Sequence, residues 1–247
     1  MQTNQNHPII PKTWNLPEIF RRRLGESVGR QRLMVEEGNY LAVLHQLPMA
    51  SDKGQRQAAL FWINERQEWK SAPDSGGRSA LRELVKTYQD RIQSLDQLLD
   101  RSEKASEIHD IIDEVTPLLR AGRNMMQVIQ ELRQSLSDDQ QLIVIRDQAI
   151  DVERSSELLL QDAKSSLDYL IARNSSEQAE AAAAATCEAR KLNRLAAFFF
   201  PLATLATVFG MNPPSEVVQL NGVWIVVAVG LITGLIVYGL LCAGRKS

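Results

Sequence analysis

The pattern of hydrophobic and polar positions changes twice along this 247-residue chain. Residues 1–78 mix short apolar runs with turn residues, and residues 79–191 repeat apolar positions at helical spacing. Residues 192–247 contain two long apolar stretches. We therefore predict three domains with these bounds: a small mixed region, a helical bundle with a stalk, and a transmembrane domain. The expected fold class is mainly α, with a small β element near the N-terminus.

The N-terminal region carries the strand signals. Tyr40–Leu47 and Ala59–Trp69 are rich in β-branched and aromatic residues with rough alternation, and a Ser-Asp-Lys-Gly turn region separates them. This pattern predicts a β-hairpin. Residues 1–38 are rich in proline, glycine and charge, which predicts irregular structure with one short helix. The proline, glycine and serine content of Lys70–Gly77 predicts a linker.

Two paired helices are expected next. From Ser79, apolar residues at three- and four-residue steps share one helix face: Leu81, Leu84, Tyr88, Ile92, Leu95, Leu98 and Leu99. A second helix begins near Ala105. Thr116-Pro117 fits an N-cap followed by proline at the first helical position, so we expect the helix to restart there. It continues through Leu136, with Met125-Met126 in the bundle core, and the two stretches form an antiparallel pair.

A third helix carries the longest uninterrupted pattern. Ser137 and Gln140 have the spacing of a capping box, which predicts its start. A heptad-like apolar stripe follows, with Ser156 and Ser166 at intervening core positions: Leu142, Ile145, Ala149, Val152, Leu159, Ala163 and Leu170. If continuous to Phe209, this helix is roughly 110 Å long. A helix of that length cannot bury its face alone, which indicates a coiled-coil or bundle stalk.

Two segments, Leu192–Met211 and Val223–Cys242, are each 20 residues of mainly apolar character. That length spans a hydrocarbon core of roughly 30 Å. Basic residues flank the outer ends of this pair: Arg190, Lys191 and Arg194 before it, and Arg245 and Lys246 after it. The connecting loop has no basic residue and one acid, Glu216. The positive-inside bias predicts a multi-pass protein of the cell membrane, with both termini cytoplasmic and the short loop outside.

Composition and charge narrow the classes further. The averages of 44% hydrophobic and 23% charged residues resemble those of a soluble protein, yet the ionisable side chains lie mostly upstream of Leu195. The net charge of −2 gives no argument for a nucleic-acid partner. The two cysteines make no disulfide framework. The N-terminus lacks an apolar stretch after a basic start, so we expect no cleavable signal peptide.

Enzyme signatures are missing from the sequence. His7, His45 and His109 lie in unrelated contexts without cysteine or histidine at metal-ligand spacing, and there is no glycine-rich phosphate loop. We expect neither an enzyme nor a bound cofactor.

The first apolar segment ends in Gly210-Met211-Asn212, and Pro201 lies eleven residues before Asn212. This arrangement resembles the CorA-type magnesium channels, whose pore helix ends in Gly-Met-Asn, carries a proline at that distance and is followed by a second, outer helix. The resemblance covers about Ser137–Ser247 well, the preceding helix pair fairly and residues 1–78 poorly. It implies a homo-oligomeric divalent-cation channel in the lipid bilayer, by resemblance a pentamer. Mg²⁺ is the expected transported ion, with Co²⁺ and Ni²⁺ as further candidates.

The resemblance also assigns residues at the outer mouth. A ring of Asn212 amide oxygens can accept hydrogen bonds from the waters of a hydrated cation, which suits an ion that dehydrates reluctantly. Gly210 lets backbones approach at the helix end, and Met211 packs beside it. Glu216 is the candidate for attracting cations in the outer loop, although this loop lacks the family's usual Met-Pro-Glu-Leu run.

The candidates deeper in the pore match the family's positions less closely. The family places an inner hydroxyl nine residues before the asparagine, where this chain has Ala203; Thr204 and Thr207 are the nearby candidates for pore lining. Their hydroxyls could equally bond only to the preceding helical turn. Phe200 lies where the family has a bulky apolar constriction, and Asn193 could face the cytoplasmic mouth.

Two alternative functions remain open from the sequence. A zinc transporter of the same superfamily would carry the same Gly-Met-Asn motif. A non-conducting, membrane-anchored coiled-coil scaffold would keep the fold without an ion path. The family's sizeable α/β sensor domain has no clear counterpart in residues 1–78, so no regulatory metal site is predicted.

Overall fold

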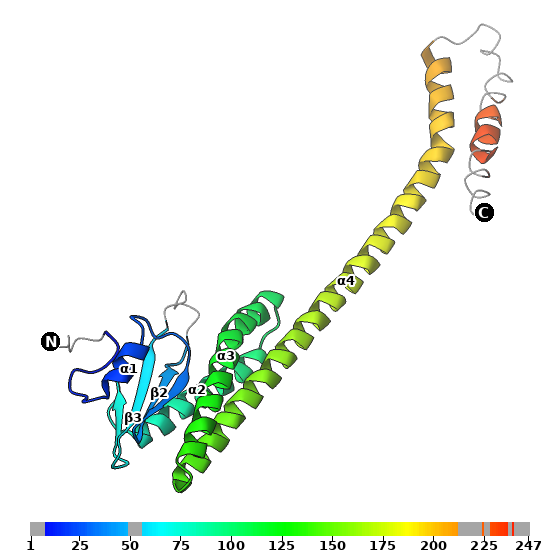
Figure 1. Ribbon diagram of the computed structural model, residues 1–247. Coiled ribbons are helices and arrows are strands. Elements are labelled where there is room, and N and C mark those ends of the chain that lie inside the picture. Colours follow the sequence, from blue (N-terminus) through cyan, green and yellow to red (C-terminus); the bar gives the residue numbers. More distant parts are fainter. Residues whose placement is uncertain (1–7, 49–55, 212–223, 225–227, 237–238, 240–247) are drawn as a thin grey trace. The chain divides into compact units, whose positions relative to one another are not determined.

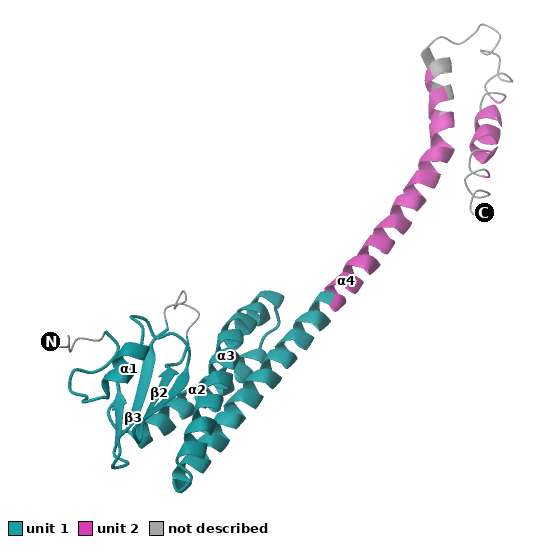
Figure 2. Cartoon of the chain, viewed as in Figure 1, with its two compact units in different colours: residues 1–171 teal, residues 172–247 magenta. Residues whose placement is uncertain are grey.

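The computed structural model describes residues 8–48, 56–211, 224, 228–236 and 239. The chain divides into two compact units, Met1–Ile171 and Ala172–Ser247 (Figure 2). The first unit contains a sheet and a set of packed helices (Figure 1). The second contains the C-terminal part of the longest helix and a shorter helical segment at 228–236.

A four-stranded antiparallel sheet lies near the N-terminus, after the short helix α1 (Glu18–Arg23). Its strands, in the order β1-β2-β3-β4, are β1 (Arg32–Glu36), β2 (Asn39–His45), β3 (Ala58–Ile63) and β4 (Trp69–Ala72). The predicted hairpin is the central pair β2–β3. The predicted sheet had too few strands, because β1 and β4 flank this pair. The predicted linker was wrong at Lys70–Ala72, which belongs to β4.

Alternation along the central strands separates two apolar faces. One face, which includes Leu44, Phe61 and Ile63, packs into a cluster with the helices. The other face packs against the N-terminal segment, where the rings of Trp14 and Trp62 lie 5.8 Å apart. Residues 8–24 therefore cover one side of the sheet and the helices cover the other.

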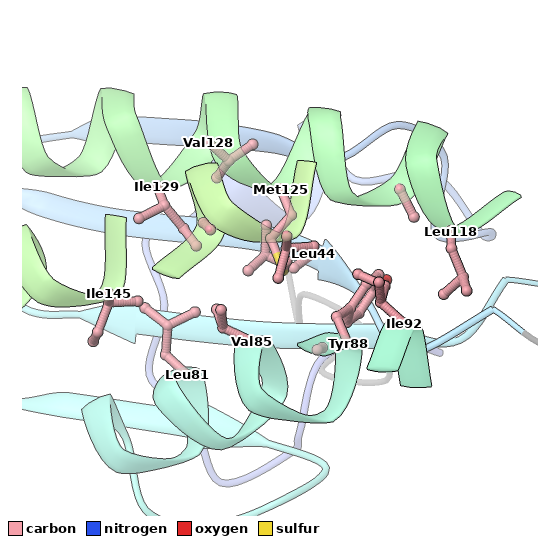
Figure 3. Packing of buried hydrophobic residues seen from close by; sticks show 14 of the residues in the cluster. Leu44, Leu81, Val85, Tyr88, Ile92, Leu118, Met125, Val128, Ile129 and Ile145 are labelled. Atoms are coloured by element: carbon pink, nitrogen blue, oxygen red, sulfur yellow. The ribbon is translucent and has the colours of Figure 1, made fainter. Parts of the chain in front are cut away.

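Three helices complete this unit: α2 (Arg78–Leu99), α3 (Ala105–Ser135) and the first part of α4 (Gln140–Met211). Side chains from α2, α3, α4 and β2 point into one shared core (Figure 3). The predicted apolar face of α2 is confirmed at Leu81, Tyr88 and Leu95, which are fully buried. It was wrong at Leu98, which is 47% exposed in the last turn of the helix. The Tyr88 hydroxyl donates to the carbonyl oxygens of His45 (3.2 Å) and Gln46 (3.1 Å), and burial raises the pKa of Tyr88.

The expected helix restart at Thr116-Pro117 was wrong, because α3 continues through both residues. The Thr116 hydroxyl donates to the carbonyl oxygen of Ile112 at 2.7 Å, inside the helix, rather than capping a new one. Val115 and Leu118 are buried on either side of the pair. Packing of these neighbours outweighs the one backbone hydrogen bond that proline removes.

The predicted capping box at the start of α4 was also wrong in detail. Gln140 is the first residue of the helix rather than its third. The carboxylate of Asp139 accepts from the backbone N–H of Gln141 at 3.0 Å, while the Ser137 hydroxyl contacts Asp138. Asp139 also pairs with Arg78 at 2.6 Å. A carboxylate at a helix N-terminus is favoured by the helix dipole as well.

The heptad-like stripe of α4 is confirmed within the first unit. Six of its apolar side chains are buried in the common core: Leu142, Ile145, Ala149, Val152, Leu159 and Ala163. Ser156 is buried among them, and its hydroxyl donates to the Val152 carbonyl oxygen at 2.7 Å. Arg123 of α3 pairs with Glu153 of α4 at 2.7 Å beside the stripe. Met125 is fully buried, as expected for the bundle core.

The connection from β4 into α2 depends on Gly77. Its φ of +56° lies in the left-handed region, and an added Cβ would lie 2.7 Å from the Trp69 Cβ. Its backbone N–H donates to the Ser71 hydroxyl at 2.8 Å. Any side chain at this position would therefore meet both backbone strain and a steric clash.

Candidate functional site

The candidate site lies in the second unit, on the last five turns of α4. Within the part of the chain that the structure describes, no helix combines the length and apolar character needed to cross a membrane. The predicted second span is described only at residues 224, 228–236 and 239. Asn212 and Glu216 also lie outside the described residues, and Gly210 and Met211 are described only in their backbone.

Large apolar side chains are exposed along this part of α4. Leu192, Leu195, Phe199 and Phe200 are all more than half exposed, with Phe200 at 73%. A charged or polar residue usually occupies such positions on a helix in water. Exposed apolar side chains also occur on α4 in the first unit, such as Leu158 at 50%, but there they are interspersed with charged residues.

Helical geometry brings the inner candidates onto one face. Asn193, Phe200, Thr204 and Thr207 follow one another at steps of seven, four and three residues, and α4 is helical throughout this stretch. Residues at these spacings lie above one another on a helix surface. Asn193 is exposed, like the other three side chains. Met211, four residues beyond Thr207, is the last residue of α4 and continues the same register.

The two threonine hydroxyls bond within their own helix. Thr204 donates to the carbonyl oxygen of Phe200 at 2.8 Å, and Thr207 donates to that of Ala203 at 2.7 Å. Hydroxyls of this kind satisfy their donor on the preceding turn. Each oxygen keeps lone pairs that can still accept from water.

The opposite face of α4 packs against the segment 228–236. An added Cβ at Gly234 would lie 3.0 Å from the carbonyl oxygen of Phe198 and 3.2 Å from Cδ2 of its ring. Gly230 and Gly234 are both buried, in contrast to Leu231 and Leu235 beside them. Their spacing is that of the small-xxx-small pattern of closely packed apolar helices. This sequence signal was overlooked, although it identifies the contacting face.

A groove of about 470 Å³ lies along this helix contact. It is lined by Lys191, Arg194, Leu195, Phe198 and Leu235. Both basic residues belong to the flank that the sequence pattern assigns to the cytoplasmic side. Among the described residues, no three histidine, cysteine, aspartate or glutamate side chains could together hold a metal ion.

Comparisons with known proteins add little to this geometry. The chain matches no protein-family model. It also matches no curated protein. Among solved structures, it is similar to a chain described as the complete structure of CorA magnesium transporter from Methanocaldococcus jannaschii, at 12% sequence identity. The match covers 89% of this chain and 81% of that chain, with a TM-score of 0.38, which is too low to define a shared fold.

Proposed function

We propose that this chain is the subunit of a homo-oligomeric membrane channel for divalent cations, with Mg²⁺ as the main ion. The observation that carries the proposal is the position of Gly210-Met211-Asn212. Gly210 and Met211 are the last described residues of α4, and Asn212 follows them in the sequence, eleven residues after Pro201. The resemblance to CorA-type channels rests on this combination.

The two faces of α4 support this assignment. Asn193, Phe200, Thr204 and Thr207 share one face, and the roughly opposite face holds Phe198 against Gly234. In an oligomer, the first face would line an axial path and the second helical segment would lie outside. A two-helix subunit cannot enclose a pore alone, so the proposal requires self-association, by resemblance as a pentamer. The basic flanks support a topology with both termini in the cytoplasm.

Asn212 would select the ion at the outer mouth. A neutral amide oxygen can accept hydrogen bonds from the first hydration shell of Mg²⁺, which exchanges its waters reluctantly. Each subunit would contribute one such oxygen. Because every contact is made to water rather than to the ion itself, Co²⁺ and Ni²⁺ could also pass.

The test is cation uptake by the full chain in vesicles that contain a magnesium indicator. Asn212→Ala should lower uptake by about tenfold or more, the factor that corresponds to one charge-assisted hydrogen bond. Asn221→Ala is the matched control, because it removes the same amide from the same loop, and it should keep uptake within about twofold. Both variants should assemble into the parent oligomer, which mass measurement in mild detergent would establish.

Three outcomes would change the proposal. Uptake of zinc but not magnesium by the parent protein would favour a zinc transporter. Equal uptake by the parent and Asn212→Ala would remove the role of the motif. Assembly without any cation uptake would favour a membrane-anchored scaffold, an alternative with which the internally bonded hydroxyls of Thr204 and Thr207 also agree.

A further inference from the structure

The groove beside the helix contact has two chemically different ends. Lys191 and Arg194 lie at one end, one helical turn apart, and Leu195, Phe198 and Leu235 form the rest of its lining. Basic and apolar surfaces therefore meet within one hollow of about 470 Å³. A ligand that fits both ends must itself be amphiphilic and carry a negative charge.

The basic end has unused hydrogen-bonding capacity. Within the described part of the chain, no carboxylate forms a salt bridge with Lys191 or Arg194. By contrast, Arg78, Arg123 and Arg173 each pair with an acid. Arg194 is half-buried, so the residues around it restrict its position. A guanidinium can donate two parallel hydrogen bonds to a phosphate, and a lysine nearby adds a further charge.

The apolar part of the groove is open to the surroundings. Leu195 is 56% exposed and Leu235 is 59% exposed, and they belong to the two segments that make the helix contact. Phe198 is half-buried, and its ring and backbone oxygen lie beside Gly234 of the second segment. A hydrocarbon chain laid along these three side chains would cover apolar area that water otherwise contacts.

We propose that this groove binds one anionic phospholipid, with its phosphate against Lys191 and Arg194 and an acyl chain along Leu195, Phe198 and Leu235. This inference depends on the membrane location in the proposed function, but not on ion conduction. The basic end lies on the predicted cytoplasmic flank, where anionic lipids attract basic side chains. The bound lipid would fill the seam between the two helical segments and hold them together.

The test uses the purified full chain in mild detergent, with phosphatidylglycerol and phosphatidylcholine of the same acyl chains as probes, and native mass spectrometry as the readout. Phosphatidylglycerol should bind more tightly. Arg194→Gln should weaken its binding by about fivefold, and Lys191→Gln with Arg194→Gln by about 25-fold, since each basic side chain near anionic lipid contributes a factor of about five. Phe198→Ala should weaken the binding of both lipids.

Arg190→Gln is the matched control, because it removes an exposed basic residue that does not line the groove. It should change phosphatidylglycerol binding by less than about twofold. An equal loss for Arg190→Gln and Arg194→Gln would mean diffuse attraction and overturn the proposal. Equal binding of the two lipids by the parent protein, or displacement of the lipid by equimolar inorganic phosphate, would also overturn it.

The outcome is separable from that of the uptake experiment. A protein that floats with vesicles and prefers phosphatidylglycerol, yet transports no cation, would contradict the channel and keep the lipid site. A protein that transports magnesium but binds both lipids equally would support the channel and contradict the lipid site.

Discussion

The helix α4 has two stretches with opposite surroundings. Between Leu142 and Ala163 its stripe consists of small and medium side chains, and these are almost completely buried against α2 and α3. Between Leu192 and Phe200 its apolar side chains are larger, and most of them are exposed. The hydrophobic effect explains the first stretch within the unit itself. In the second, the described residues leave most of this apolar area uncovered.

The two stretches of α4 also differ in the polar residues that they carry. In the first, the outer positions mix exposed apolar side chains, such as Ile150 and Leu158, with acids and bases, such as Glu153, which pairs with Arg123. In the second, Asn193 and Arg194 lie at the start, and the next polar side chains along the helix are those of Thr204 and Thr207, whose hydroxyls bond to their own helix. Charged side chains are therefore frequent on the outer side of the first stretch and absent from the sequence between Leu195 and Met211.

The largest expected effect comes from placing a charge in each stretch. Val152→Asp buries a carboxylate in the core of the first unit and should destabilise it by about 4 kcal/mol or more. Phe199→Asp replaces a side chain that is 55% exposed, so the stability of the first unit should change by less than about 0.5 kcal/mol. It should instead reduce flotation with vesicles, because an aspartate within a span costs about 3 kcal/mol.

Chemical denaturation followed by circular dichroism measures the first effect, and vesicle flotation measures the second. Phe199→Leu is the control, since it keeps an apolar side chain at the same position. If Phe199→Asp unfolded the first unit or floated like the parent protein, the contrast between the two stretches would not hold.

A smaller effect is expected from adding one methyl group at a helix contact in each unit. At Gly234 the new Cβ would meet a backbone carbonyl oxygen, that of Phe198, at 3.0 Å. At Gly122 it would meet a side-chain methyl, Cγ1 of Val152, at 3.0 Å. The backbone cannot rotate away, whereas the valine can adjust. Gly234→Ala should therefore destabilise its contact by about 1–3 kcal/mol.

Gly122→Ala should remain within about 1 kcal/mol of the parent protein, because the higher helix propensity of alanine offsets the tight packing. Amide hydrogen exchange in 195–200 and in 118–126 measures the two contacts separately. The comparison would be reversed if Gly122→Ala increased the exchange rate of 118–126, relative to the parent protein, more than Gly234→Ala increased that of 195–200.

The smallest effect should follow removal of a hydroxyl that bonds within its own helix. Ser156→Ala should change the free energy of unfolding of the first unit by less than about 1 kcal/mol, since alanine favours the helix and no partner from another element is lost. Thr207→Val should retain more than about half of the parent uptake for the same reason. A much larger loss at Thr207 would indicate that its oxygen contacts the ion path.

The helices could be predicted because their apolar positions repeat at a regular spacing over many turns. Leu81 through Leu95 predicted the buried face of α2, and Leu142 through Ala163 predicted that of α4. The two misplaced helix starts involved local signals that other contacts outweighed. Thr116-Pro117 is a good helix start, but buried neighbours keep α3 continuous. Arg78 and the Gln141 amide engage Asp139, so α4 does not begin at Ser137.

The sheet and the candidate site show different limits of sequence patterns. The strands β1 and β4 have mostly half-buried residues, so their alternation is too weak to predict them. At the site, Phe200 was predicted by resemblance, and Asn193, Thr204 and Thr207 were predicted from their polar side chains. Only the unbroken helix places the four on one face. The groove could not be predicted, because Arg194 and Leu235 are far apart in the sequence and meet only through the contact at Gly234.

Gly77 has a consequence for how this sequence can diverge. Two independent constraints act on the position, the left-handed φ of +56° and the approach of the Trp69 Cβ to within 2.7 Å of an added Cβ. A homologue that relieves one constraint by mutation still meets the other. Descendants that keep this route from sheet to helix should therefore keep glycine at this position. A relative with any other residue there should differ in the length or path of the connection, and that difference would mark a branch point in the lineage.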